Sequence, residues 1–168
     1  MTKKEVAGQI EIGDLAKDEL TGFEGVVIGR TFWLTNCDRL TLQPRTLTKD
    51  GEPQKPVSFD IMHCKRLKKS VVPVVEKLWD TKSEIALGDT ARDSITGFEG
   101  TVIARTIWIA SADNILIQPA GLKDSQPHEP KWFNPTHLTL VKKLNPPAPK
   151  ENRGGPMPEP RRGQEAKR

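Results

Sequence analysis

The same order of hydrophobic and polar positions occurs twice along the chain, 75 residues apart. The first copy runs from Ile10 to Pro44 and the second from Ile85 to Pro119, and the two align without a gap. Beyond Pro44 one residue drops out and the offset becomes 74. Roughly two positions in five are identical. Because this period is longer than a solenoid unit, each copy is predicted to be a small domain.

Within each copy, the pattern predicts five short β-strands. Runs of β-forming residues at 26–34 and 101–109 are apolar on both parities, which is typical of a strongly curved strand with its bend at Gly29 or Ala104. Alternating strands at 39–43 and 114–118 end at a proline. Short strands are expected at 58–59 and 132–133, and a last segment ends at 67 or 141. Strands punctuated by Gly and Pro predict an all-β fold, a partly open small barrel in each copy.

An identical turn, Thr-Gly-Phe-Glu-Gly, precedes the long strand in both copies. Glycines on both sides of a fixed Phe-Glu indicate either a positive φ or close backbone packing. The phenylalanine is expected to cap the core. The structural turn residues are therefore Gly22, Phe23, Gly25, Gly97, Phe98 and Gly100.

The predicted domains are residues 8–69 and 83–144, with a linker at 70–82 and a tail at 145–168. The linker is too apolar for a free tether and is expected to fold against a barrel, with a helical turn after Pro73. The tail holds six prolines and three glycines, and Met157 is its one large apolar side chain. That composition predicts disorder.

Charge gives a weaker indication of function than the sequence pI of 9.1 suggests. The tail carries six basic and three acidic residues, which leaves twenty basic and nineteen acidic residues in the other 144. The predicted globular part is nearly neutral, whereas nucleic-acid binding by counterion release needs a basic surface. No apolar run is long enough to span a membrane, and the N-terminus lacks the apolar run of a signal peptide. Synthesis in the cytoplasm is expected.

No motif for catalysis, a metal or a cofactor emerges from the sequence. The two cysteines, Cys37 and Cys64, have no counterpart in the second copy, so they are expected to be buried or half-buried thiols rather than a disulfide. Two of the repeated acids can act as an acid–base pair, but acids beside glycines more often cap turns. These acids are Asp14, Asp18, Glu24, Asp89, Asp93 and Glu99. The aligned histidines, His63 and His137, lack a nucleophile partner and are expected to be structural. We therefore predict no catalytic residue, no metal, no cofactor and no enzyme activity.

The opening G-D-x-A-x-D-x-x-T-G-F-E-G-x-V resembles the KOW and SH3-like small-barrel pattern. It is more similar still to short uncharacterised proteins of bacteriophages and prophages with a GDxxxDxxTGFxG motif, a Gln-Pro after the third strand and a Trp-Phe-Asp element near the end. In the second copy, Gln118-Pro119 and Trp132-Phe133-Asn134 match these elements, and in the first copy Ser58 replaces the tryptophan. The resemblance implies tandem SH3-like barrels and a place in the host cytoplasm or the phage virion.

Candidate binding residues follow from the long strands. Arg30 and Arg105 each lie three residues before a tryptophan, and this composition is typical of interface hot spots or base-stacking platforms. The alternative is that the tryptophan is in the core and the arginine lies along the barrel wall. Two glutamines are expected to point outward and complete the same surface, and Trp132 has no aromatic counterpart in the first copy. The candidate set is Arg30, Trp33, Gln43, Arg105, Trp108, Gln118 and Trp132. In the tail, Arg161 and Arg162 are candidate contacts to phosphate or an acidic protein surface, or part of a solubilising terminus.

Three functions remain open on this basis. The leading expectation is a non-enzymatic protein-binding or assembly module of a bacteriophage, an accessory component of the head surface with a phage structural protein as partner. The first alternative is a KOW-like nucleic-acid-binding protein. The second is a counter-defence protein that sequesters a nucleotide signal. No membrane partner is expected, and self-association into an oligomer stays open.

Overall fold

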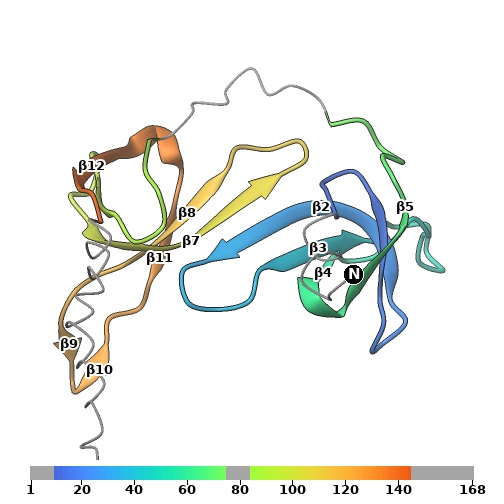
Figure 1. Cartoon of the computed structure of the whole chain (residues 1–168), viewed down its shortest axis with the longest axis horizontal. Coiled ribbons are helices and arrows are strands. Elements are labelled where there is room, and N and C mark those ends of the chain that lie inside the picture. The colour runs from blue at the N-terminus through green and yellow to red at the C-terminus, as the bar shows by residue number, and fades with distance from the viewer. Residues whose placement is uncertain (1–9, 75–83, 145–168) are drawn as a thin grey trace, which may run out of the picture.

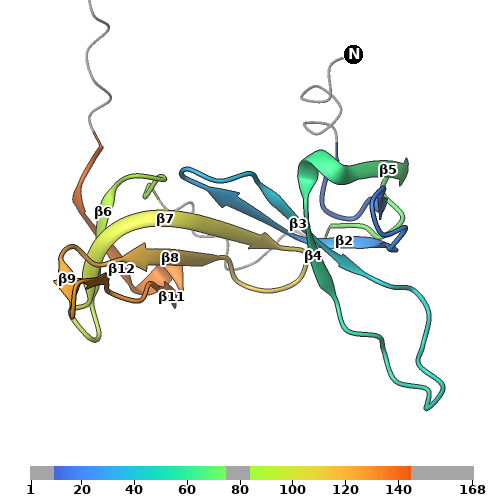
Figure 2. The same cartoon turned by 90° about the horizontal axis from the view of Figure 1, so that it is seen from below.

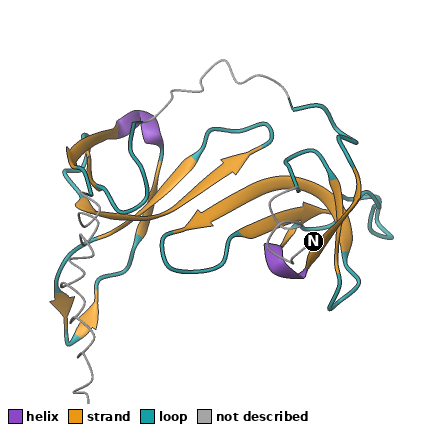
Figure 3. Cartoon of the chain, viewed as in Figure 1, coloured by secondary structure: helices purple, strands orange, loops and turns teal. Residues whose placement is uncertain are grey.

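The computed structural model describes residues 10–74 and 84–144, and in this part of the chain the regular structure is strands and two short 3-10 helices (Figures 1 and 3). The first repeat contains β1 (Leu15–Asp18), β2 (Glu24–Trp33), β3 (Arg39–Gln43), β4 (Val57–Asp60) and β5 (Cys64–Lys68), with a 3-10 helix at Ile61–His63. The second contains β6 (Thr90–Asp93), β7 (Glu99–Trp108), β8 (Asn114–Gln118), β11 (Lys131–Phe133) and β12 (Leu138–Lys142), with a 3-10 helix at Pro135–His137.

Strand order is the same in both repeats. In the first, β1 to β4 form an antiparallel meander, and β5 returns after the 3-10 helix to pair with β1. In the second, β6, β7, β8 and β11 form the meander, and β12 pairs with β6. Five strands in this order, with a helical turn before the last, make an SH3-like barrel, and the sheet stays partly open. The predicted all-β fold of two tandem SH3-like units is confirmed.

Each repeat has its own hydrophobic core. Ile10, Val27, Leu40 and Leu42 are fully buried in the first, and Ile115 and Ile117 are fully buried in the second. The turn phenylalanines close these cores: Phe23 packs on Phe59 and Phe98 on Phe133, each pair with ring centroids 5.1 Å apart. The predicted capping role is confirmed.

The glycines of the repeated turn have two different reasons to be glycine. Gly22 and Gly97 have φ of 77° and 75°, a region that disfavours a side chain. Gly25 and Gly100 have no such constraint, but a Cβ on either would collide with the backbone of the third strand, at Gln43 or Gln118. Both predicted reasons hold, at different positions of the turn.

The long strands bend where the sequence suggests. Pairing of β2 with β3 shifts register between Val27 and Gly29, and pairing of β7 with β8 shifts between Val102 and Ala104. A bulge of this kind sharpens the twist of a strand. It allows the first half of each long strand to serve its own barrel while the second half extends beyond it.

The extended halves of β2 and β7 pair with each other and join the repeats into one ten-stranded sheet (Figure 1). Thr31 lies opposite Thr106, its own counterpart in the repeat, and their hydroxyl groups are 2.8 Å apart. The pairs on either side, Gly29 with Trp108 and Trp33 with Ala104, are also exchanged by the repeat. A local two-fold axis therefore passes between the two threonines. The sequence did not predict this junction.

The loop between the third and fourth strands differs between the repeats. In the second repeat it contains a hairpin of β9 (Leu122–Lys123) and β10 (Gln126–Pro127), turned at Asp124 and Ser125, both with positive φ. The first repeat has a single bridge there, and its loop projects from the barrel (Figure 2).

The described part of the linker contacts the first repeat. The N–H groups of Val71 and Val72 donate to the carbonyl of Gly13, at 2.9 and 3.2 Å. The predicted helical turn after Pro73, most of the linker and the predicted disordered tail at 145–168 lie outside the described residues. The predicted domain boundaries stay predictions.

Candidate functional site

The repeated aspartates are buried and accept hydrogen bonds from backbone N–H groups. Asp18 accepts hydrogen bonds from the N–H and the hydroxyl of Thr21, at 2.8 and 2.7 Å, and Asp93 accepts the same two from Thr96. These bonds, the side-chain one first, lower the pKa of both carboxyl groups. The prediction that these acids cap turns is confirmed.

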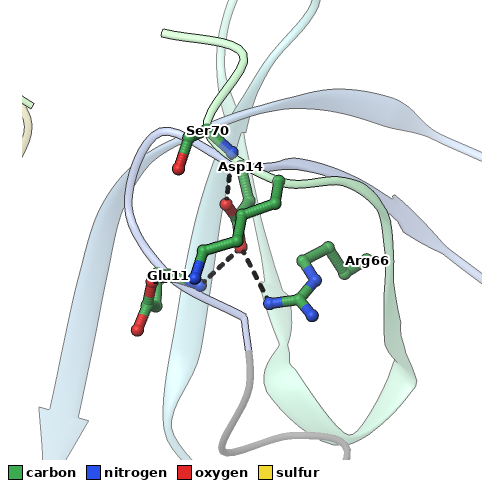
Figure 4. Close-up of polar contacts among 5 residues, drawn as sticks. Glu11, Asp14, Arg66 and Ser70 are labelled. Carbon is green, nitrogen blue, oxygen red and sulfur yellow. Dashed lines mark hydrogen bonds and ion pairs between the residues drawn. The ribbon is translucent and has the colours of Figure 1, made fainter. Parts of the chain in front are cut away.

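The other two aspartates, Asp14 and Asp89, connect the chain segments that enter and leave each barrel, and Figure 4 shows these contacts for Asp14. Asp14 accepts from the N–H of Glu11 and of Ser70 and lies 3.6 Å from the Arg66 guanidinium. Asp89 accepts from the N–H of Ala86 and of Leu144. Those backbone bonds lower the pKa of Asp89.

The two candidate arginines are paired within their own repeats. Arg30 forms an ion pair with Asp38 at 3.1 Å, and its guanidinium lies 4.7 Å from the centre of the Phe32 ring. Arg105 pairs with Asp113 at 2.9 Å. Both arginines are only partly exposed, and each fastens the hairpin that follows its strand.

The predicted surface of arginines, tryptophans and glutamines is divided between two faces, which corrects the sequence interpretation. Successive side chains of a strand point to opposite faces. Arg30 and Trp33 are three positions apart, so they lie on opposite faces, as do Arg105 and Trp108. Arg30 lies opposite the core residue Leu40, whereas Trp33 shares a face with Thr31 and Gly29. The alternative interpretation is wrong for the tryptophans, because neither belongs to a core cluster. Its other part, with the arginine along the barrel wall, stays a prediction.

Tryptophans mark both ends of an apolar row across the second repeat. Trp33 lies opposite Ala104, Ala104 opposite Leu116, and Leu116 opposite Trp132. Directly paired residues point to the same face, so these four side chains, here called the tryptophan row, form one continuous strip. Ala104 and Leu116 are 0% and 5% exposed although they lie outside the core cluster, while Trp132 is 47% exposed.

The equivalent row in the first repeat has a different chemistry. It runs from Trp108 through Gly29 and Thr41 to Ser58. The Trp108 ring lies over Gly29, where a Cβ would come within 2.6 Å of it, and the hydroxyl groups of Thr41 and Ser58 are 2.9 Å apart. Both rows lie on the same face, on either side of the threonine pair. The two-fold symmetry of the backbone is therefore broken by the side chains.

A polar pocket adjoins the tryptophan row at Trp33. Its volume is about 430 Å³, and it is lined by Trp33, Asn36, Cys37, Arg39 and Asp60. Arg39 and Asp60 form an ion pair at 2.9 Å and are partly exposed. The repeat places Asn114 and Asn134 at the corresponding positions beside Trp108. At these two positions the charged pair of the first repeat is therefore replaced by two neutral amides in the second.

The two glutamines lie on the tryptophan side of the sheet, but loops occupy their amide groups. Gln43 donates to the carbonyl of Gln54 at 2.6 Å, and Gln118 donates to the carbonyl of His128. Each amide anchors the loop between the third and fourth strands. A binding role for either glutamine stays a prediction.

No protein-family model and no curated protein matches the chain. Among solved structures, it is similar to one described as the crystal structure of ADCP1 tandem Agenet domain 3-4. The identity is 20%, the match covers 84% of this chain and 87% of that one, and the TM-score is 0.26. With a TM-score this low, function has to be argued from the chain's own residues.

The cysteines and histidines give no sign of a chemical centre. Both thiols are free; Cys64 is buried, which raises its pKa to about 11, but Cys37 is exposed, contrary to prediction, because it lies in the turn after β2. His63 and His137 are exposed in the 3-10 helices, where their carbonyls accept from Glu19 and Ser94. Within residues 10–74 and 84–144, no His, Cys, Asp and Glu side chains cluster as metal ligands do, and no helix has the length and hydropathy of a membrane span.

Proposed function

We propose that this chain is a non-enzymatic protein-binding module that holds its partner on the tryptophan row. The observation that carries the proposal is the half-exposed indole of Trp132, which shares one apolar strip with the partly exposed Trp33, while Ala104 and Leu116 between them are buried. Tryptophan is enriched among the residues that dominate binding energy at protein interfaces. The pocket at Trp33 adds a charged pair, Arg39 and Asp60, at the border of the strip.

A catalytic role has less support than protein binding. The carboxyl groups of the repeated aspartates are buried and occupied by backbone and threonine donors. Their lowered pKa values at Asp18, Asp89 and Asp93 are the opposite of what a general acid at neutral pH requires. We therefore propose binding and not turnover.

The biological setting that we propose is a bacteriophage, with the protein as an accessory component of the virion. The support is the resemblance of the GDxxxDxxTGFxG motif to phage and prophage proteins. Mass spectrometry of purified particles from the source phage tests this setting. Detection at a copy number that matches a capsid or tail symmetry is expected, and absence from the particle contradicts it.

The binding proposal is tested by Trp132→Ser, with Leu122→Ser as matched control. Leu122 is 66% exposed in the same repeat but lies in the β9–β10 hairpin, outside the tryptophan row. Proteins that co-purify with the wild-type chain from infected cells are expected to lose at least about 30-fold in affinity with Trp132→Ser, the loss of a hot-spot residue. They are expected to bind Leu122→Ser as well as wild type. Equal binding by both variants contradicts the proposal.

The same purified protein is used to distinguish a nucleic-acid partner from a protein partner. Binding of a mixed-sequence oligonucleotide that falls by orders of magnitude between 50 and 200 mM salt indicates phosphate contacts. That result, together with loss of the oligonucleotide in Trp132→Ser, replaces protein binding by nucleic-acid binding on this face.

A further inference from the structure

We infer that a pocket of the second repeat binds a small organic phosphate monoester. This site goes beyond the proposed function, because it shares no residue with the tryptophan row. The pocket has a volume of about 420 Å³, which is in the range of small-ligand sites, about 300–1,000 Å³. Its lining combines two threonines, two lysines and two leucines: Thr90, Thr101, Lys142, Lys143, Leu34 and Leu144.

Strand pairing brings the polar groups of this pocket together. Lys142 on β12 lies opposite Thr90 on β6, and Thr90 lies opposite Thr101 on β7. Directly paired residues point to the same face of a sheet, so one ammonium group and two hydroxyl groups lie in one row. In the described part of the chain, neither hydroxyl makes a hydrogen bond. The row therefore offers three unoccupied donors, and Lys143 adds a fourth to the same pocket.

The exposed charge of the pocket is positive. None of its lining residues is acidic, and within residues 10–74 and 84–144 neither Lys142 nor Lys143 forms an ion pair. The carboxylate near Lys143 is that of Asp89, which is buried. Its two oxygens already accept the N–H groups of Ala86 and Leu144. An anionic ligand therefore finds the two ammonium groups available for charge-assisted hydrogen bonds.

A phosphate monoester fits these donors better than a carboxylate does. It carries a charge of about −1.5 to −2 at pH 7 and three strong acceptor oxygens. A carboxylate carries one charge and two oxygens. The pocket offers two ammonium groups and two hydroxyl groups, so the acceptors of a phosphate are matched and those of a carboxylate leave donors unused.

The two leucines select a ligand with an organic part. Leu34 is 39% exposed and Leu144 is 57% exposed. The backbone of both is held in place, because Leu34 donates its N–H to the carbonyl of Ile103 at 2.9 Å and Leu144 donates to Asp89 at 2.8 Å. Beside the donors, the pocket therefore has an apolar wall that an organic group on the phosphate removes from water.

The first repeat has the same row with a different chemistry. There Lys68 lies opposite Leu15, and Leu15 lies opposite Val26, which is only 6% exposed. Two aliphatic side chains take the place of the two threonines, so the first repeat keeps the lysine and lacks the hydroxyl donors. Thr90→Leu combined with Thr101→Val therefore transfers the row of the first repeat into the second, with residues that the fold already accepts at these positions.

The test measures ligand binding by the full chain through its backbone amide signals in two-dimensional NMR. The ligands are phenyl phosphate, inorganic phosphate and benzoate, each titrated at the same ionic strength. Phenyl phosphate is expected to bind saturably, to shift the signals of Thr90, Thr101 and Lys142, and to bind at least about tenfold more tightly than the other two. A tenfold difference corresponds to about one charge-assisted hydrogen bond.

Two lysine variants separate the pocket from general attraction of anions. Lys142→Ala combined with Lys143→Ala is expected to weaken phenyl phosphate binding at least about tenfold. The matched control, Lys68→Ala combined with Lys69→Ala, removes the same charge at the equivalent positions of the first repeat and is expected to leave the affinity unchanged. The threonine variant is expected to lose affinity while keeping all four lysines.

The inference is overturned if phenyl phosphate does not saturate, if benzoate or inorganic phosphate binds equally well, or if the two lysine variants lose affinity equally. Unchanged affinity of the threonine variant also overturns it. A mixed-sequence oligonucleotide that displaces phenyl phosphate and binds more tightly assigns the pocket to nucleic acid instead. Each of these failures leaves the proposed function standing, because the effect of Trp132→Ser on partner binding is measured separately.

Discussion

Single aspartates carry the local geometry of this fold. Asp18 and Asp93 sit at the same place in the two repeats, each buried and each holding the N–H and hydroxyl of a threonine three residues later. The turn that they close presents the phenylalanine to the core. These aspartates, which are candidate acids in the sequence, therefore have a structural role in the fold. Their negative charge contributes to the stability of the folded state.

Stability is expected to fall in acid. The pKa values of Asp18, Asp89 and Asp93 are lowered in the folded state, so the unfolded chain binds protons first as the pH decreases. Their stabilising contribution is complete above the unfolded value of about 4 and is lost as the pH falls from there through the folded values. Urea titrations between pH 7 and pH 2.5 measure this.

The variant Asp93→Asn provides the check on that prediction. It is expected to be less stable than wild type at pH 7 and to show a shallower loss of unfolding free energy below pH 4. Thr96→Val removes the hydroxyl donor and leaves the charge, so it should lower stability while retaining part of the acid dependence. An unfolding free energy that is constant from pH 6 to pH 3 contradicts the assignment.

At the scale of the strands, the hydrophobic pattern predicts well because each strand serves a local core. The curved strand with its bend beside Gly29, the half-buried third strand and the capping role of Phe23 all follow from residue types and spacing. The sequence predicts the candidate surface less well. Closeness in sequence suggests that Arg30 and Trp33 share a surface, but they differ in parity and therefore lie on opposite faces.

Pairing between strands of different repeats could not be predicted from the pattern. The alignment of Trp33 with Ala104, Leu116 and Trp132 depends on the register of three separate strand pairs. Register across the junction is set by packing between the repeats, which no local pattern encodes. One indication was present: the long strands remain apolar on both parities to their ends, which is more than one barrel needs.

The contact between Gly29 and Trp108 gives a physical reason for a glycine at this position of β2. The glycine makes room for the Trp108 ring, whereas the equivalent Ala104 lies opposite Trp33 with its Cβ in place. Gly29→Val is expected to cost about 1–3 kcal/mol, because the added atoms force the indole to move. Chemical denaturation measures the loss, and tryptophan fluorescence reports the displaced ring.

Ala104→Val serves as the matched control for that substitution. It adds volume at the equivalent position of the other repeat, where the paired ring already accommodates a Cβ, so a smaller loss is expected. If the two valine variants are equally destabilised, the close approach of Trp108 does not explain the glycine.

At the scale of the whole molecule, we expect the stability of the two barrels to depend on their shared sheet. A unit of about sixty residues buries a modest core and is marginal alone. The junction adds five paired positions, and at its ends Leu34 donates to the carbonyl of Ile103 and Ile109 to that of Ile28, at 2.9 and 2.8 Å. It also creates the face proposed for binding, because the tryptophan row takes Trp33 from one repeat and its other members from the second. Loss of the junction therefore removes the site along with the stability.

We expect the wild-type chain to unfold in one transition, with equal calorimetric and van't Hoff enthalpies. Leu34→Pro combined with Ile109→Pro removes the donor N–H at both ends of the junction, at about 0.5–1.5 kcal/mol for each bond. This variant is expected to broaden or split the transition in scanning calorimetry. Leu34→Ala with Ile109→Ala truncates the same side chains but keeps both donors, so it should unfold as one unit. Two resolved transitions in the wild-type chain would instead mean that each barrel is stable by itself, and that the sheet positions the tryptophan row without holding the repeats together.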